Sequence, residues 1–201
     1  MPEDSIEHID FDDLNKRAIS QPLVKHIFTA DPSAHVFNGK IYIFPSHDIE
    51  NDIPFDDLGS HFAMEDYQVL SMENPNAEAI DNGIALHVKD ILWADKQMWA
   101  PDAAEKNGIY YLYFPAKGHD GIFRIGVATS SSPSGPFTPQ SEAINESFSI
   151  DPAIFKDEDG SYYMYFGGIW GGQLQRWRTG KFNADGEGPL VHLPEDNEPA
   201  L

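Results

Sequence analysis

Three aspartates in one recurring context could act together on a substrate. Asp31 and Asp151 each precede a proline and then a small residue, whereas Asp102 follows a proline. Carboxylates that converge on one site raise one another's pKa, and such a shift suits general acid and base catalysis. The alternative is that each aspartate caps a turn or accepts hydrogen bonds from backbone donors where a strand begins. The spacing of the aspartates alone does not separate the two interpretations.

Side chains suited to sugars stand near the same points of the sequence. Aromatic rings can cover the apolar face of a sugar, and Asp and His side chains can bind its hydroxyl groups. Our candidates for substrate binding are His47, Asp48, Trp99, Asp102 and Trp170. Core packing is the open alternative for the two tryptophans, and a purely structural role is the alternative for His47.

The aspartates belong to three repeats of one hairpin pattern, at residues 31–44, 101–114 and 151–166. Each repeat has an Asp beside a Pro, a short strand, an Asn-Gly or Asp-Gly pair, and a run rich in Tyr, Phe and Ile. Asn-Gly and Asp-Gly supply the positive φ of a type I′ turn, and the flanking residues favour pleated sheet. The sequence therefore predicts the same β-hairpin three times.

Further strands follow the hairpins, at 67–72, 123–130 and 174–178, so each unit has about four short antiparallel strands. The units begin 71 and then 49 residues apart, and the longer interval contains a polar insertion at 51–65. Four-stranded repeats of about 40 to 50 residues are typical of β-propeller blades. A β-sandwich is the alternative, but it gives no reason for each unit to restart on Asp and Pro.

A propeller would bring the three aspartates together. The innermost strand of each blade lines the central channel, so Asp31, Asp102 and Asp151 are expected at one mouth of that channel. Alternate aromatic residues of the hairpins are then expected to form the core between blades. These aromatic residues are Tyr42, Phe44, Tyr111, Tyr113, Tyr163 and Tyr165.

Composition limits the classes of partner. The chain has 201 residues, 33 Asp and Glu against 13 Lys and Arg, a formal net charge of −20 and no cysteine. The negative charge argues against nucleic acid and against an anionic membrane surface. The lack of cysteine excludes disulfides, thiolate metal sites and a cysteine nucleophile. With 41% hydrophobic residues the chain can bury a core, and a neutral or cationic ligand fits the charge best.

The N-terminal segment and the hydropathy bear on location. No apolar run approaches the roughly 18 residues that a membrane span needs. The acidic N-terminus is not followed by the apolar stretch of a signal peptide. We expect a cytoplasmic protein for the sequence as written, and a periplasmic or secreted one if a leader has been removed. Residues 7–19 could carry a short helix, but their aspartates are spread around it, so we interpret them as part of a lead-in arm.

Five segments resemble glycoside hydrolase family 43. They are residues 29–33, 44–48, 99–102, 126–137 and 149–153, and the resemblance runs in order from about residue 25 to residue 172. It implies an all-β fold, a five-bladed β-propeller of four-stranded antiparallel blades. This chain would supply an N-terminal arm at 1–24 and blades I–III at 25–201. The family contains β-xylosidases, α-L-arabinofuranosidases and arabinanases, so an oligosaccharide or polysaccharide is the implied substrate.

The resemblance also implies an inverting mechanism with three carboxyl groups. Asp31 matches the general base that activates water, and Asp151 matches the residue that tunes the pKa of the acid. The acid itself is a Glu of the fourth blade. A fourth unit is due near residue 200, and neither Glu195 nor Glu198 has the strand context of that acid. We therefore expect the acid and the remaining blades outside this chain, in a longer protein or a separate polypeptide, and an inactive fragment without them.

Two other interpretations of the resemblance stay open. One is a carbohydrate-binding propeller without catalysis, and the other is a retaining hydrolase with Asp31 as nucleophile. No cofactor is required by the implied mechanism, and a structural calcium ion in the central channel is an option to which Asp102 and Asp151 could contribute. The insertion at 51–65 is expected to shape the rim of the pocket. The sequence does not choose between arabinosides and xylosides.

Overall fold

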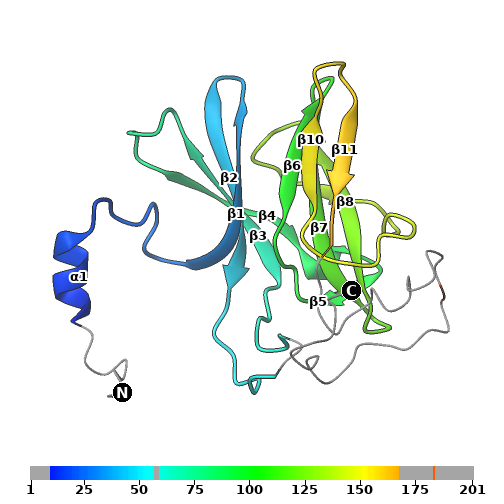
Figure 1. The fold of residues 1–201 in the computed structure, drawn as a ribbon, viewed down its shortest axis with the longest axis horizontal. Helices are drawn as coiled ribbons and strands as arrows, with labels where there is room; N and C mark the ends of the chain where they lie inside the picture. The colour runs from blue at the N-terminus through cyan, green and yellow to red at the C-terminus, as the bar shows by residue number, and fades with distance from the viewer. Residues whose placement is uncertain (1–9, 57–58, 168–182, 184–201) are drawn as a thin grey trace, which may run out of the picture.

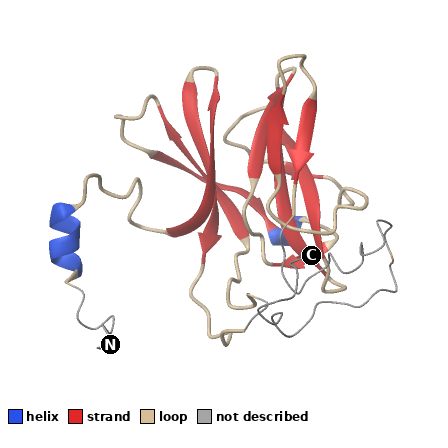
Figure 2. Cartoon of the chain, viewed as in Figure 1, coloured by secondary structure: helices blue, strands red, loops and turns tan. Residues whose placement is uncertain are grey.

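The computed structural model describes residues 10–56, 59–167 and 183, and these residues are almost entirely β-structure (Figures 1 and 2). The helical parts are α1 (Phe11–Arg17) and a single 3₁₀ turn, η2 (Val88–Asp90). Within the described residues no helix is long and apolar enough to cross a membrane. The strands form three antiparallel sheets that follow one another along the chain.

The first sheet is blade I, and it has four strands in chain order. They are β1 (Phe28–Phe37), β2 (Lys40–Asp48), β3 (Asp66–Met72) and β4 (Ile80–His87). Every neighbouring pair is antiparallel. Strand β3 is buried along its whole length, whereas β1 and β4 have mostly exposed and half-buried positions. The blade therefore has a covered centre and more open outer strands.

The second sheet is blade II, built on the same plan with one extra strand. Its strands are β5 (Ala94–Lys96), β6 (Asp102–Lys106), β7 (Ile109–Gly118), β8 (Phe123–Ser130) and β9 (Thr138–Pro139). β6 pairs with the first half of β7, and β5 pairs with its far end. Blade III is described for its first hairpin, β10 (Ala153–Lys156) with β11 (Tyr162–Tyr165). This architecture confirms the repeated antiparallel unit, while the strand expected at 174–178 lies outside the described residues.

The hairpin turns match the prediction in two cases out of three. Asn38-Gly39 and Asn107-Gly108 both have positive φ at both positions, as a type I′ turn requires. The third turn is longer than predicted. Its residues 157–161 close with a hydrogen bond from the N–H of Asp157 to the carbonyl of Ser161, and only Gly160 among them has positive φ. The prediction of a two-residue turn there was wrong, because two more residues precede the Asp-Gly pair.

The main hydrophobic core lies between blades I and II. Phe37 packs edge-on against Tyr110, with ring centroids 5.2 Å apart, and Phe44 packs edge-on against Phe137 at 6.3 Å. Phe44 is fully buried. Burying a side chain of this size contributes about 1.5–3 kcal/mol to folding. The interface thus fixes the first two blades against each other.

The aromatic residues predicted for this core do not all share its environment. Tyr42 packs against the core cluster, and Tyr111 and Tyr113 are half-buried. Tyr163 and Tyr165 of blade III are 46% and 63% exposed, so the prediction of a core role was wrong for them in this chain. Their strand β11 is an edge of its two-stranded sheet.

The N-terminal arm contains a helix that the sequence interpretation did not assign. The Asp10 side chain accepts a hydrogen bond from the N–H of Asp13 and caps α1. Acidic residues stand in the first turn and basic residues in the last, which complements the helix dipole. The cap and the placement of charges at the two ends stabilise the helix, although its aspartates are spread around it. After the helix, His26 contacts Asp81 of β4 at 2.7 Å, so the arm reaches across blade I.

Candidate active site

Asp31 sits at an irregularity of the innermost strand of blade I. The register between β1 and β2 shifts between Ala30 and Ser33, and Asp31 has φ of 47°, in the left-handed region. Pro32 has no N–H to give to the ladder, which explains a break at this point. Bulges of this kind re-aim side chains and are frequent beside active sites. The Asp31 side chain is accordingly exposed, although its strand is part of a packed sheet.

Asp151 repeats this backbone at the start of blade III. It has φ of 54°, it is exposed, and its neighbours Ile150 and Pro152 are buried. The carbonyl of Ile150 accepts a hydrogen bond from the N–H of Gly167, which holds the segment in place. Asp tolerates the left-handed region better than most residues. Two exposed aspartates in left-handed backbone thus open the first and third blades.

The two aspartates influence each other electrostatically. Partial burial raises the pKa of Asp151, and the negative charge of Asp31 raises it further. Beneath them lies Tyr67, which is fully buried. Burial first, and then the charges of Asp151 and Asp31, raise the pKa of Tyr67 well above its ordinary value. Blades I and III therefore bring these two carboxylates into one neighbourhood, as the propeller prediction requires.

Trp99 joins this neighbourhood through Tyr67. The Tyr67 hydroxyl donates to the Trp99 carbonyl at 2.6 Å, and the Trp99 indole N–H donates to the Phe62 carbonyl at 2.8 Å. The indole ring also contacts Phe123, with centroids 4.6 Å apart. A Cβ on Gly59, which has φ of +68°, would lie only 3.0 Å from Trp99 Cη2. The insertion of blade I is therefore packed against Trp99.

Asp102 has a different environment from the other two repeat aspartates. It is buried, and its Oδ1 accepts hydrogen bonds from Ser33 Oγ at 2.5 Å and His35 Nε2 at 2.6 Å. Its Oδ2 accepts from the backbone N–H of Ile154 at 2.5 Å. Burial alone would raise the pKa of Asp102, but the bonds from His35, Ser33 and Ile154 outweigh burial and lower it. Protein groups from two strands, β1 and β10, thus occupy both carboxylate oxygens, which the sequence interpretation assigns to substrate binding.

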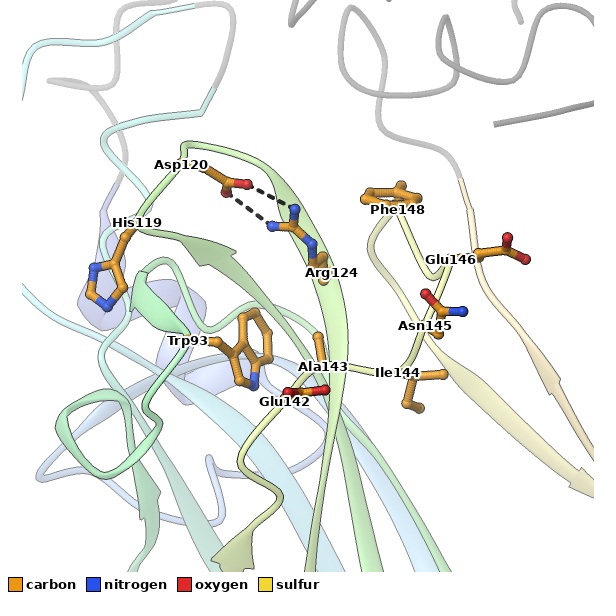
Figure 3. Close-up of a pocket in the computed structure, with 10 residues that line it drawn as sticks. All are labelled: Trp93, His119, Asp120, Arg124, Glu142, Ala143, Ile144, Asn145, Glu146 and Phe148. Atoms are coloured by element: carbon orange, nitrogen blue, oxygen red, sulfur yellow. Dashed lines mark hydrogen bonds and ion pairs between the residues drawn. The ribbon is translucent and has the colours of Figure 1, made fainter. Parts of the chain in front are cut away.

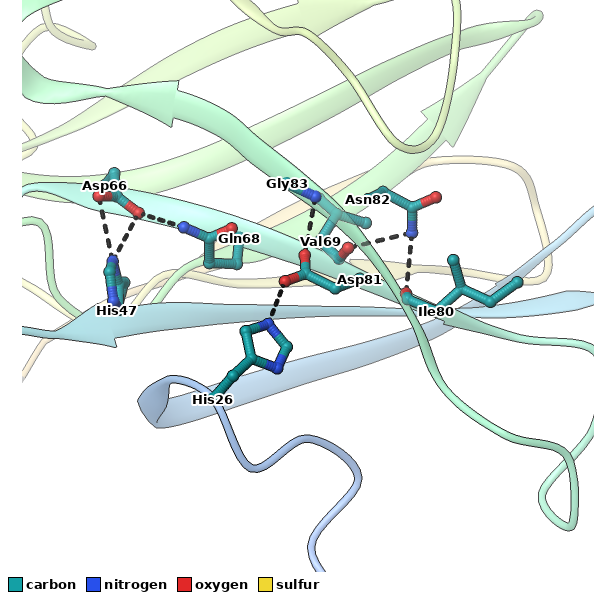
Figure 4. Close-up of polar contacts among 9 residues, drawn as sticks. All are labelled: His26, His47, Asp66, Gln68, Val69, Ile80, Asp81, Asn82 and Gly83. Carbon is teal, nitrogen blue, oxygen red and sulfur yellow. Dashed lines mark hydrogen bonds and ion pairs between the residues drawn. The ribbon is translucent and has the colours of Figure 1, made fainter.

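His47 and Asp48 lie at the end of β2 in blade I. His47 Nδ1 contacts Asp66 Oδ1 at 3.1 Å, and Gln68 Nε2 donates to the same oxygen at 2.9 Å (Figure 4). The contact with Asp66 therefore occupies Nδ1 of His47. Asp48 is half-buried and pairs in register with Phe28. Trp170, the remaining candidate, lies outside the described residues.

A hollow of about 390 Å³ on blade II lies apart from these candidates (Figure 3). Trp93, Asn145 and Phe148 are among its lining residues, and none of our candidate site residues lines it. Arg124 in its wall is paired with Asp120 through two bonds of 2.8 and 2.9 Å. We therefore centre the candidate site on Asp31 and Asp151.

Some residues of the site carried no recognised signal in the sequence. Ser33, His35 and the buried Phe37 are spaced two residues apart along β1 and therefore share one face of the strand. Polar residues on the same face as a core residue could have marked them as partners of a buried polar group. Tyr67 offered no such signal, because a buried tyrosine in a strand resembles any other core aromatic. Among the residues that the structure describes, no three His, Asp or Glu side chains form a group that could hold a metal ion.

The comparisons with known proteins all lead to one family. Residues 20–189 match the family Glycosyl hydrolases family 43. The chain is 60% identical over 172 residues to xylosidase/arabinosidase 43A of Humicola insolens, covering 84% of this chain and 53% of that protein. It is 53% identical over 180 residues to a xylosidase/arabinosidase of Bacteroides ovatus, covering 89% and 54%.

Solved structures of the same family also match this chain. One is a GH43 β-xylosidase/α-arabinofuranosidase from a compost microbial metagenome in complex with xylotriose, in a calcium-free form. It has 65% identity and a TM-score of 0.78 over 83% of this chain and 51% of that one. Another is a GH43_1 enzyme from Xanthomonas citri, with 52% identity and a TM-score of 0.78 over 94% and 53%. The chain thus spans about half the length of the relatives it matches.

Proposed function

This chain belongs to glycosyl hydrolases family 43. We propose that it provides the part of a glycosidase active site that contains the general base and the residue that tunes the pKa of the acid. The substrates proposed are glycans that contain xylose or arabinose. The observation that supports this most is the coupled pair of exposed aspartates, Asp31 and Asp151, which open blades I and III in matching left-handed backbone. Both lie within the residues that match the family.

In the proposed reaction Asp31 is the general base. Its carboxylate takes a proton from a water molecule, the water oxygen forms a bond to the anomeric carbon, and the glycosidic C–O bond breaks. The leaving oxygen takes its proton from the general acid, which we place outside this chain. Attack from the face opposite the leaving group inverts the anomeric centre, and the base and the acid must then stand about 6.5–9.5 Å apart to admit the water.

Asp151 is proposed to tune the acid rather than to react itself. A general acid must keep its proton near neutral pH, and a neighbouring carboxylate raises its pKa. Asp151 is exposed and already feels the charge of Asp31, so it can present a negative charge to a third carboxyl group. This division matches the roles that the family resemblance implies for the two residues.

The proposed substrate class rests on the relatives and on Trp99. Two similar proteins carry xylosidase/arabinosidase names, and one similar structure is a complex with xylotriose. Trp99 is half-buried, its carbonyl accepts from Tyr67, and its indole donates to Phe62 and contacts the ring of Phe123, so it offers a fixed ring for a pentose. Xylo-oligosaccharides are therefore the first substrates to test, and arabinofuranosides the second.

The partner proposed for this chain is the rest of a propeller. Apolar side chains are exposed on both outer blades: Val36 is 68% and Ile84 is 53% exposed on blade I, and Tyr165 is 63% exposed on blade III. Further blades, in the same protein or another polypeptide, would cover such surfaces and supply the acid. Among the described residues no three His, Asp or Glu side chains form a group for a calcium ion.

The test uses the complete protein that carries this chain. Asp31→Asn should lower kcat on 4-nitrophenyl β-xyloside or α-L-arabinofuranoside by about 10²–10⁴-fold, the usual contribution of a general base. Its fold should be retained, because Asn also tolerates left-handed backbone. The control is Asp90→Asn, an exposed aspartate of the 3₁₀ turn, which should keep full activity.

Three results would contradict the proposal. Unchanged turnover in the Asp31 variant would reject the base assignment. Binding of xylotriose by the wild type without any product would indicate a carbohydrate-binding propeller. Release of the retained anomer first, observed by NMR, would indicate a nucleophile in place of a base.

A further inference from the structure

One buried carboxylate connects β1, which carries Asp31, with β10, which begins two residues after Asp151. Asp102 opens β6, and β6 contacts both β1 and β10 (Figure 1). Its Oδ1 accepts from Ser33 and His35 in β1, and its Oδ2 accepts from the N–H of Ile154 in β10. Ser33 lies two residues after Asp31, and Ile154 lies three residues after Asp151. The chain of bonds therefore runs from one proposed catalytic strand to the other through a single side chain.

An ionised Asp102 can only accept, so in this state the Ser33 hydroxyl and an Nε2–H of His35 both donate to Oδ1. Besides Ser33, His35 and Ile154, the backbone N–H of Ala103 donates to Oδ1 at 2.8 Å. His35 is itself fixed, since its ring stacks on Phe37 with centroids 5.6 Å apart. An ionised carboxylate is well suited to this setting because it only accepts, and it can face donors on both sides. Hydrogen bonds to an ionised group are about twice as strong as neutral ones.

The blades do not need this contact merely to stay together. At the hairpin ends, Asn38 Nδ2 of blade I donates to the Tyr110 hydroxyl of blade II at 2.7 Å. The Tyr162 hydroxyl of blade III donates to the Glu105 carbonyl of blade II, also at 2.7 Å. Both bonds join the same blades but lie next to the turns, several residues along the strands from Asp31 and Asp151. Asp102 is the contact that lies next to the two kinked aspartates.

We propose that Asp102 is a positioning residue that fixes the separation and relative orientation of Asp31 and Asp151. The inference rests on the proposed function, because it assigns Asp102 to the geometry of that reaction. An inverting enzyme must hold a water between base and acid, and a displacement of about 1 Å can lower a rate by about 10²-fold. A bond network that spans both catalytic strands would limit such displacements.

Asp102→Asn in the complete protein is the main test. Asparagine has no charge and only one acceptor oxygen. If that oxygen keeps the N–H of Ile154, the NH₂ group faces Ser33 and His35, which must then accept, so weaker neutral bonds replace the charge-assisted ones. We expect kcat to fall about 10- to 100-fold while KM changes about 2-fold or less. We also expect the pKa of Asp151, followed by ¹³C NMR of labelled aspartate carboxyls and assigned with Asp151→Asn, to move toward the ordinary value.

Two sets of variants separate positioning from charge and from stability. Ser33→Ala combined with His35→Phe keeps the charge of Asp102 and its bond to Ile154, and removes the side-chain links to β1. This variant should change kcat and the Asp151 pKa in the same direction as Asp102→Asn. Tyr110→Phe and Tyr162→Phe remove the hairpin-end bonds of the same blades, and they should change neither quantity.

The outcomes are distinct. A folded Asp102→Asn protein with wild-type kcat and an unchanged Asp151 pKa would overturn the inference, as would equal effects from the two tyrosine variants. If Asp102→Asn does not fold, Ser33→Ala alone gives the test, with a smaller shift of the same sign expected and no shift overturning the inference. If the wild type hydrolyses no glycoside but the pKa of Asp151 still responds to Asp102→Asn, the proposed function fails and the positioning role stands.

Discussion

The starts of blades I and III differ from the start of blade II by the order of two residues. In blades I and III an aspartate precedes a proline, and in blade II the proline comes first. Asp31 and Asp151 adopt left-handed backbone and are exposed, whereas Asp102 pairs in register with Tyr113 and is buried. A proline has no N–H, so an Asp before it stands where the ladder is broken, and an Asp after it enters the ladder. The same residue type thus becomes either a solvent-facing acid or an internal acceptor.

The largest expected effect comes from removing the internal acceptor. Asp102→Ala leaves four donors from three strands without a carboxylate, and breaking a buried charged network of this kind costs about 3–5 kcal/mol. Asp31→Ala, at an exposed position, should cost far less. Urea denaturation of both variants in the complete protein measures the difference, and equal losses would show that the two environments are energetically alike.

A smaller effect is expected from the backbone of the kinked aspartates. Asp31→Val places a β-branched residue at φ of 47° and should lower stability by about 1–2 kcal/mol. Asp31→Asn should leave stability nearly unchanged, because asparagine tolerates this region. Thermal unfolding of Asp31→Val and Asp31→Asn measures this difference. Asp102→Asn, at the buried aspartate, is the contrasting variant. If the Asp31→Val protein is as stable as the Asp31→Asn protein, the left-handed backbone at position 31 places no energetic restriction on the residue type.

The smallest effect is a difference in pH dependence. The pKa of Asp151 is raised, so its ionisation costs stability as pH rises above the ordinary value near 4. Asp151→Asn should therefore gain a few tenths of a kcal/mol at neutral pH, because the exposed carboxylate is screened by water, and the gain should vanish below pH 4.

Asp102 should show the opposite sign. Its pKa is lowered, so its contribution to stability is complete above the ordinary value and is lost as pH falls toward the lowered pKa. The deficit of Asp102→Asn should thus narrow in acid. Parallel unfolding curves from pH 3 to pH 7 for both variants measure the two slopes. Slopes of the same sign would remove the distinction between the two kinds of aspartate.

Local signals in the sequence predicted much of the fold. The turns Asn38-Gly39 and Asn107-Gly108 and the aromatic runs after them are sufficient for two hairpins, because turn chemistry acts over a few neighbouring residues. The pairing of β5 with the far end of β7 was not predicted, since a three-residue strand carries too little pattern. The third turn was predicted too short, because the Asp-Gly pair does not indicate how many residues of the turn precede it.

The candidate site was predictable only in part. The repeated Asp-Pro pattern singled out Asp31 and Asp151, and the structure places them within reach of each other's charge. Asp102 differed in the sequence only by following its proline, and its burial and partners were not predicted because they depend on contacts across 67 to 69 residues of chain. Single positions such as Ser33 and His35 acquire their role only when the blades are side by side. Long-range pairing of polar groups is the information that a local pattern lacks.

The close approach of Gly59 to Trp99 has a consequence for the position of the indole ring. The ring belongs to blade II, but the residue that leaves room for it belongs to the insertion of blade I. One added methyl group at position 59 would press on the edge of the indole and tilt it. Because we propose that Trp99 binds the pentose, we expect substitutions at position 59 to change the preference for xylosides or arabinosides while both aspartates stay in place.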